Sequence, residues 1–436
     1  MQKKLLVISL TLFLILSFAA AAYAQTTTIR YFMWDPEFKA VEQKLIDQFE
    51  AENPDIEVEF TALEPSNYWP KISAMASAGE LPDVFSMSSG YIDQWAQDGL
   101  LMNIQDQVDT LPQDDYFTKV FSTLRYPDKE SSDMYGMPYA WVTTVLYYNK
   151  DMFDQAGLDY PDENWSWEDF RKAAVELTID ENEDGIAERY GHWWYGRYAH
   201  VEPWVYANGG RILNEDKTRI EVDAKAKEAL HFLGDLSNEY NVSPPKRDIV
   251  GIRQQDMFPL EQTAMWVDGS WNIQHVRDMV NGKFDWGIAK VPAGPSAEPG
   301  DYEAYGWPDS IAISKNSEQQ EAAWKLVKYL VGKNRPLESY MAGKVPINKE
   351  LANSEQWIEE EKQPAEMEIV LELGEMIGRT SFTIGWGEWR GYADTGGAGM
   401  NGVLDSVTNG EMTVEEAIES FTKHGNEVLE RYYPEE

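Results

Sequence analysis

Residues 28–60 read TIRYFMWDPEFKAVEQKLIDQFEAENPDIEVEF, and this stretch decides the fold. It begins with β-type residues over 28–33 and continues into 37–50, where apolar side chains recur at helical spacing. A turn over 53–55 leads into 56–60, in which apolar and acidic residues alternate as they do in a strand. The stretch therefore predicts a strand, a helix and a second strand.

The same alternation continues along the chain. A helix is predicted over 68–78 up to Gly79, then a strand over 83–87 and a helix over 91–96. Strands that alternate with helices indicate an α/β fold class with a largely parallel sheet covered on both faces. Later patterns predict helices over 150–156, 167–177, 223–238, 319–331 and 413–429, and strands over 284–291 and 311–314.

The first 24 residues have the pattern of an export signal. Lys3 and Lys4 precede an apolar run over 5–18, and the small residues Ala22 and Ala24 fit a cleavage site. The alternative is a retained membrane anchor, but the run is short for a span and no positive charges follow it. We therefore expect a signal peptide over 1–24 that is cleaved after Ala24.

The composition limits the cellular compartment and the classes of binding partner. The chain has no cysteine, so disulfides, cysteine-ligated zinc and a lipid anchor on a cysteine are excluded, and we expect a free periplasmic monomer. With 37 basic and 75 acidic residues, the formal net charge is −38, which disfavours nucleic acid and anionic membranes as partners. The acids are spread along the whole chain, which favours a solvated surface over a site for a cationic ligand. The sequence contains no second long apolar segment, so we expect no membrane insertion.

Several segments, in order, resemble the sugar-binding proteins of ATP-driven (ABC) importers, the maltose-receptor-like family. The most specific stretch is LYYNKDMF at 146–153. The resemblance covers nearly all of the chain after the signal, and its other segments are FEAENPDIEV (49–58), GELPDVF (79–85), DGLL (98–101), AGL (156–158), WSWE (165–168), AM (264–265), GSW (269–271), FDWG (284–287), IAIS (311–314), AAW (322–324) and 410–417.

The resemblance implies a two-lobed periplasmic-binding-protein fold of type II, with a hinge between the lobes and the ligand in the cleft. The N-terminal lobe would comprise 25–140 plus 308–344, and the C-terminal lobe 141–307 plus 345–436. It implies a receptor rather than an enzyme, with no required cofactor. The receptor would capture a mono- or oligosaccharide, close about its hinge and deliver the sugar to the permease subunits of an ABC transporter.

A sugar has apolar C–H faces and a rim of hydroxyls, so its binder needs aromatic rings for the faces and planar polar groups for the rim. The chain has 17 Trp, 23 Tyr and 16 Phe to draw on. Trp271 resembles the stacking tryptophan of the family. The predicted ligand-binding residues are Trp34, Asp35, Ser89, Gly90, Trp141, Thr143, Trp271, Trp307, Asp309, Trp386, Trp389 and Arg390.

Each of these residues has a structural alternative. Trp271 could pack in the core, and Trp34 with Asp35 could form only a strand-end turn. Trp386, Trp389 and Arg390 lie in a glycine-rich stretch that could be a surface loop, although the fork of Arg390 suits vicinal hydroxyls. Three further tryptophans could extend the cleft or form a packed cluster: Trp193, Trp194 and Trp204.

The segment after the third strand departs from the family pattern. Many members have a sugar-binding acid there, whereas this chain has Ser88, Ser89 and Gly90. The departure leaves open which sugar is bound.

An acidic segment at 180–188 resembles the start of a calcium loop. Oxygen ligands stand at its first, third and fifth positions and glycine at its sixth. Gly191 occupies the twelfth position, where the usual bidentate glutamate would stand, so a plain acidic turn is the alternative. The predicted calcium ligands are Asp180, Asn182, Asp184, Ile186 and Glu188.

Two other functions stay open. A secreted glycoside hydrolase would need two carboxylates about 5–10 Å apart, for which Asp35, Asp268 and Glu388 are available, but no motif selects a pair. A receptor of the same fold could also take a peptide, a polyamine or a glycerol phosphate. A phosphate ligand would favour a glycine-rich strand-to-helix loop or clustered basic residues, and neither is evident. The five histidines show no metal-binding spacing: His192, His200, His231, His275 and His424.

Overall fold

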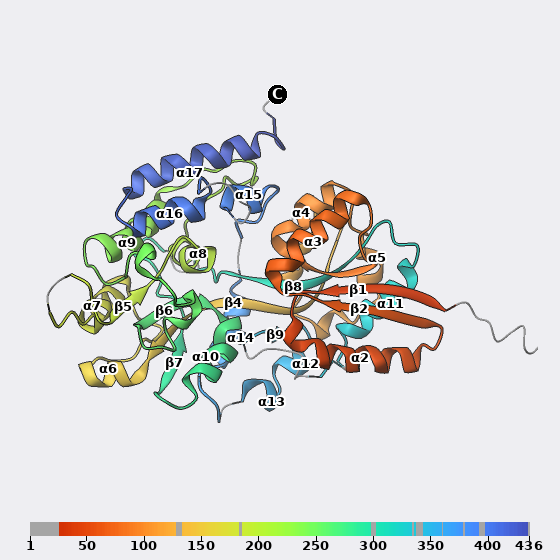
Figure 1. The fold of residues 1–436 in the computed structure, drawn as a ribbon, viewed down its shortest axis with the longest axis horizontal. Helices are drawn as coiled ribbons and strands as arrows, with labels where there is room; N and C mark the ends of the chain where they lie inside the picture. Colours follow the sequence, from red (N-terminus) through yellow and green to blue (C-terminus); the bar gives the residue numbers. More distant parts are fainter. Residues whose placement is uncertain are drawn as a thin grey trace, which may run out of the picture. The chain divides into compact units, whose positions relative to one another are not determined.

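The computed structural model describes residues 26–127, 133–182, 185–297, 302–333, 335–336, 343–359, 361–377, 380–391 and 397–434. The chain divides into two compact units. Unit 1 comprises Met1–Phe85 with Ile313–Leu330, and unit 2 comprises Ser86–Ala312 with Val331–Glu436. Figure 1 labels the helices and strands, and each unit is described by itself. The lobe boundaries implied by the family resemblance stay a prediction.

Unit 1 contains the parallel sheet that the opening stretch predicts. Strand β1 lies between β2 and β3 and is parallel to both, with Tyr31 opposite Phe60 and Phe32 opposite Phe85. Helices α2 and α11 lie along these strands in Figure 1. The elements are β1 (Thr27–Met33), η1 (Pro36–Phe38), α2 (Lys39–Glu52), β2 (Ile56–Ala62), α3 (Pro65–Ala78), β3 (Val84–Ser88) and α11 (Gln320–Leu330).

Local sequence explains these elements. The apolar side chains of α2 that recur at helical spacing, among them Leu45, Ile46 and Phe49, are buried. Helix α3 ends at Gly79, whose φ of +72° is the left-handed conformation that glycine adopts readily. Asp83 accepts hydrogen bonds from the backbone N–H of Arg30 and, through Oδ1, from the Ser317 hydroxyl, so it holds the start of β3 in place.

Unit 2 is built around β4, a strand of 13 residues that is buried throughout. Strands β6, β7, β8 and β9 all pair with β4 in the antiparallel direction, and β5 is parallel to β6. The largely parallel sheet expected from the alternation of elements is therefore found in β1–β3 but not here. Strand patterning does not encode the direction of pairing, which depends on how distant segments come together.

The strands of unit 2 are β4 (Met137–Asn149), β5 (Tyr190–Trp193), β6 (Thr263–Gly269), β7 (Trp286–Ala289), β8 (Gly306–Ile313) and β9 (Val345–Pro346). Its α-helices are α4 (Ser89–Gln97), α5 (Gln105–Val108), α6 (Lys150–Ala156), α7 (Trp167–Leu177), α8 (Tyr198–Ala207), α9 (Ala224–Asn238), α10 (Ile273–Val280), α12 (Lys349–Ala352), α13 (Glu355–Ile358), α14 (Glu368–Glu375), α15 (Trp386–Arg390), α16 (Met400–Thr408) and α17 (Val414–Leu429). Its short 3₁₀ turns are η2 (Gln113–Asp115), η3 (Thr118–Leu124), η4 (Lys246–Asp248), η5 (Gln254–Asp256) and η6 (Ser270–Asn272).

Capping residues mark the helix ends that the sequence predicts. Ser166 opens α7 with a capping box, in which its hydroxyl accepts the N–H of Asp169 and the Asp169 carboxylate accepts the N–H of Ser166. Gly157 ends α6 with φ +68°. Within the residues that the structure describes, no helix is long and apolar enough to cross a membrane.

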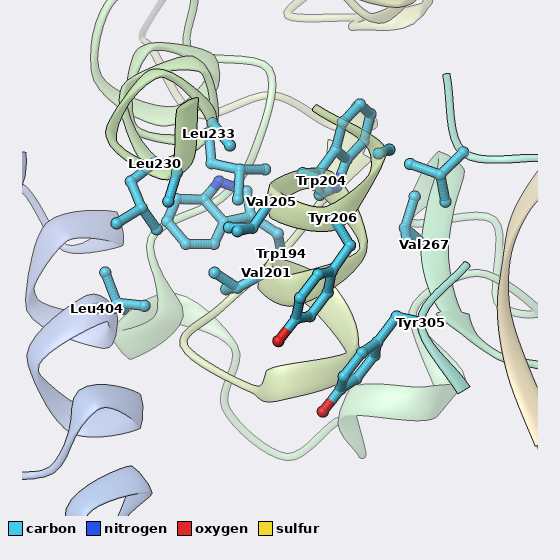
Figure 2. Close-up of a cluster of buried hydrophobic side chains, with 14 of the residues drawn as sticks. Trp194, Val201, Trp204, Val205, Tyr206, Leu230, Leu233, Val267, Tyr305 and Leu404 are labelled. Carbon is cyan, nitrogen blue, oxygen red and sulfur yellow. The ribbon is translucent and has the colours of Figure 1, made fainter. Parts of the chain in front are cut away.

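The core of unit 2 contains many large rings. The core cluster includes Trp204 and Tyr206 of α8, Leu230 and Leu233 of α9 and Leu404 of α16. Figure 2 shows the ring of Trp194 next to Leu230 and Leu233. The sequence left open whether Trp193, Trp194 and Trp204 extend the cleft or form a packed cluster. They are at most 1% exposed, as expected for a packed cluster. The same core supports the ring of Tyr305, which stacks on Tyr206 with centroids 5.5 Å apart (Figure 2).

Candidate functional site

Five aromatic side chains of unit 2 form what we call the ring cluster: Tyr198, Trp271, Trp307, Phe382 and Trp386. Trp307 of β8 lies centrally, with its centroid 5.2 Å from Trp271, 5.3 Å from Tyr198 and 5.9 Å from Phe382. Trp386 of α15 lies 5.9 Å from Tyr198 and 5.2 Å from Phe382. The structure thus brings together three of the sequence-predicted tryptophans and adds Tyr198 and Phe382, which the sequence analysis missed.

Exposure differs across the ring cluster. Trp307, Phe382 and Trp386 are almost completely buried, whereas Trp271 and Tyr198 are only partly buried. The guanidinium of Arg197 lies over both partly buried rings, 5.5 Å from the centroid of Tyr198 and 5.6 Å from that of Trp271. Solvent therefore meets two ring surfaces and one cation side by side, backed by buried rings.

The glycine of the Gly-x-Trp motif makes room for the tryptophan. A Cβ built on Gly269 would lie 2.1 Å from two carbons of the Trp271 ring, so the ring rests against the bare Cα. Glycine is the one residue type that leaves this space free. The spacing of the motif therefore has a physical cause at this site.

A buried carboxylate holds Arg197 in place. Asp268 of β6 is fully buried and its Oδ2 lies 2.8 Å from Arg197 Nη1 and 3.0 Å from His200 Nε2. Burial alone would raise the pKa of Asp268, but Arg197, His200 and the Gly269 N–H outweigh it and lower that pKa. Burial lowers the pKa of His200, so the imidazole is neutral near pH 7 and Arg197 is the cation of the group.

Ser89 and Gly90 begin α4 and lie behind the ring cluster. A Cβ on Gly90 would be 2.9 Å from Cε3 of Trp386, so glycine permits the close approach of α4 to this ring. Ser89 is buried, and its hydroxyl donates to the carbonyl of Pro308 at 3.1 Å. Gly90 is therefore next to a predicted binding ring, while the Ser89 hydroxyl has a partner inside the protein.

Thr143 and Asp309 make polar contacts within the protein. The hydroxyl of Thr143 donates to the carbonyl of Tyr305 at 3.2 Å, and its N–H donates to the Ser270 hydroxyl at 3.3 Å. Asp309 forms an ion pair with Lys344 at 3.0 Å, in which both side chains are largely buried. These contacts fix β4 and β8 beside the ring cluster.

Trp141, Trp389 and Arg390 are fully buried. The Trp141 ring packs against Phe117, with centroids 5.8 Å apart. Arg390 does not turn its fork outward: its Nε lies 3.2 Å from Oε1 of Glu202, and neither side chain is exposed to solvent. The predicted role of these three residues in ligand binding stays a prediction.

Trp34 and Asp35 follow β1 in unit 1. Trp34 is 8% exposed and contacts Tyr68 and Trp69, with centroids 5.6 and 5.7 Å away. Asp35 precedes the turn η1, and its carbonyl accepts the N–H of Phe38 at 3.1 Å. Their predicted role in ligand binding stays a prediction.

The predicted calcium loop is described in part, because Asp184 lies outside the described residues. Asp180 accepts the N–H of Gly185 at 2.9 Å, and Glu188 accepts the N–H of Glu181 and the side-chain amide of Asn182. Within the described ranges, no group of three or more His, Cys, Asp or Glu side chains is arranged for a metal ion. Calcium binding, with a carbonyl ligand from Ile186, stays a prediction that a melting curve with and without millimolar calcium would test.

The sequence profile described as "bacterial extracellular solute-binding protein" matches residues 35–333. A binding protein of Brucella abortus is 26% identical over 317 residues, which cover 71% of this chain and 73% of that protein. The maltotriose-binding protein of Pyrococcus abyssi is 25% identical over 316 residues, which cover 71% of this chain and 64% of that protein.

Among solved structures, an ABC substrate-binding protein of Listeria monocytogenes in complex with cycloalternan superposes with a TM-score of 0.79. The match covers 94% of this chain and 100% of that chain at 23% sequence identity. At this identity the likeness concerns the fold.

Proposed function

Because the chain belongs to the bacterial extracellular solute-binding proteins and has their two-lobed type II α/β fold, we propose that it captures a mono- or oligosaccharide for an ABC importer. The observation that carries this proposal is the ring cluster, whose exposed rings Trp271 and Tyr198 adjoin the guanidinium of Arg197. Aromatic faces suit the apolar C–H face of a sugar ring, and a guanidinium suits its hydroxyl rim. Sugar-binding relatives such as the maltotriose-binding protein support the same class of ligand.

The energies agree with a receptor of moderate affinity. Covering a sugar face of roughly 50–100 Å² contributes about 1–3 kcal/mol per ring at ~25 cal/mol per Å². A micromolar dissociation constant corresponds to about −8 kcal/mol. Two exposed rings supply part of this free energy, and hydrogen bonds from groups such as Arg197 would supply the rest and select the sugar.

A carbohydrate panel read by calorimetry and thermal shift tests the proposal. We expect at least one mono- or oligosaccharide to raise the melting temperature, and Trp271→Ala to weaken its binding about ten-fold or more. The matched control is Trp165→Ala, since Trp165 is likewise partly buried and packed against the core of unit 2. A panel without any binder would refute the sugar assignment, and equal effects of both variants would refute the site.

We further propose that the protein acts in the periplasm, after cleavage of residues 1–24, and passes its ligand to permease subunits after hinge closure. The family description supports an extracytoplasmic setting. Intact mass of the exported protein tests the cleavage. Small-angle scattering with and without the best sugar tests closure, which should reduce the radius of gyration.

We also propose that the protein binds its sugar as a receptor and does not hydrolyse it. Asp268, one of the three carboxylates considered for hydrolysis, is already engaged by Arg197 and His200, and Glu388 forms an exposed ion pair with Arg431. We expect bound oligosaccharides to be recovered intact after prolonged incubation. Product formation in proportion to protein concentration would contradict this expectation.

A further inference from the structure

Helices α8 and α15 contact each other through two residues of each helix. Tyr198 and Glu202 are four residues apart on α8, and Trp386 and Arg390 are four residues apart on α15. Residues at this spacing lie on the same face of a helix, one turn apart. Tyr198 contacts Trp386 at 5.9 Å with an interplanar angle of 70°, and one turn further Glu202 pairs with Arg390 at 3.2 Å.

The Glu202 carboxylate also holds the segment before α15. Its Oε2 accepts a hydrogen bond from the Ser381 hydroxyl at 2.7 Å. The next residue is Phe382, which contacts both Trp307 and Trp386 of the ring cluster. One buried carboxylate therefore connects three parts of the cluster: the helix of Tyr198, the segment of Phe382 and the helix of Trp386.

We propose that the buried Glu202–Arg390 pair positions the sugar-binding rings, so that both residues control ligand affinity without contacting the ligand. The proposal rests on the proposed function, because it assigns the ring cluster to sugar binding. It gives Arg390, whose guanidinium is fully buried in this structure, a role that needs no contact with the ligand.

Because the Glu202–Arg390 pair is buried, it favours one arrangement of the two side chains. Both side chains are 0% exposed, and their contact is an ion pair without a hydrogen bond: Glu202 Oε1 and the nitrogens Nη1 and Nη2 of Arg390 make no hydrogen bond within the described part of the chain. A buried ion that loses its partner is strongly destabilised, which gives the structure one preferred arrangement of the two helices.

The test separates positioning from general stability. Protein labelled with 5-fluorotryptophan gives a ¹⁹F NMR signal for Trp386, which is assigned with Trp386→Phe. We expect Glu202→Gln to shift or broaden this signal. We also expect it to lower the affinity for the tightest-binding sugar about ten-fold, or about 1.4 kcal/mol. Ser381→Ala removes a single hydrogen bond to Glu202 and should act in the same direction more weakly, which keeps the test available if Glu202→Gln does not fold.

Asp256→Asn is the matched control. Asp256 is another largely buried carboxylate of unit 2, and its partners are Arg253 and His275. We expect it to lower the melting temperature but to leave the Trp386 signal and sugar affinity unchanged. If Glu202→Gln destabilises the protein while the Trp386 signal stays in place, the positioning role is refuted. If the wild type binds no sugar, the proposed function fails, whereas the NMR comparison still tests the positioning.

Discussion

Gly269 decides at the level of a single residue where the Trp271 ring can lie. A methyl group at this position would overlap the ring, which must then leave its place beside Trp307. We predict that Gly269→Ala lowers sugar affinity at least ten-fold in calorimetry. Gly234→Ala is the steric control, because its Cβ would meet a core methyl of Val414 at 2.5 Å. Similar losses in both variants would mean that the effect is not specific to the site.

His192 makes stability depend on pH. Burial, followed by the neighbouring His200, lowers the pKa of His192 from 6.5 to about 3, while the Met265 carbonyl opposes the shift. Below pH 6.5 the unfolded chain binds a proton that the folded chain excludes, so stability falls as pH drops toward about 3, by up to about 1.4 kcal/mol per pH unit.

Urea unfolding at several pH values should therefore give a shallower acid slope for His192→Phe than for the wild type. His231→Gln provides the comparison at a half-buried histidine, and a change of slope as large as that of His192→Phe would mean that the effect is not specific to His192. Parallel slopes for all three proteins would contradict the assignment of this acid sensitivity to His192.

At the scale of elements, Asn149 joins the end of β4 to the start of α6. Its side chain is buried, and Oδ1 accepts the N–H of Met152 at 3.0 Å, which caps the helix. Loss of such a cap costs about 1 kcal/mol. We predict a decrease of this size in the unfolding free energy of Asn149→Ala, and a smaller decrease for Asn149→Ser, which retains an acceptor. An equal loss in both variants would argue against the cap.

For the whole molecule, the net charge of −38 is the dominant long-range property. Repulsion among excess acids destabilises a compact chain, and salt screens it. Raising NaCl from about 0.01 M to about 1 M shortens the Debye length from about 30 Å to about 3 Å. We predict that the melting temperature rises over this range and that KCl has the same effect. A melting temperature that falls with salt would mean that attractive ion pairs dominate.

The sequence by itself determined most of the elements and the family. Helix boundaries at Gly157 and Ser166 agree with the structure because capping is a local property of a few residues. The alternation in 28–60 predicted β1, α2 and β2, and Gly269-Ser270-Trp271 contains one ring of the ring cluster. Local periodicity and turn chemistry leave direct traces in the chain, so these features can be read without coordinates.

Only the tertiary structure decided which residues surround Trp271. Tyr198 and Phe382 of the ring cluster, and Arg197 beside it, belong to no motif, and they come together because α8 and the segment before α15 pack beside β8. Arg390 was expected to bind hydroxyls, yet its partner is Glu202, far away in the sequence. The partner of a side chain is set by the packing of distant segments, and the free energy of that packing belongs to the assembled core rather than to any one stretch.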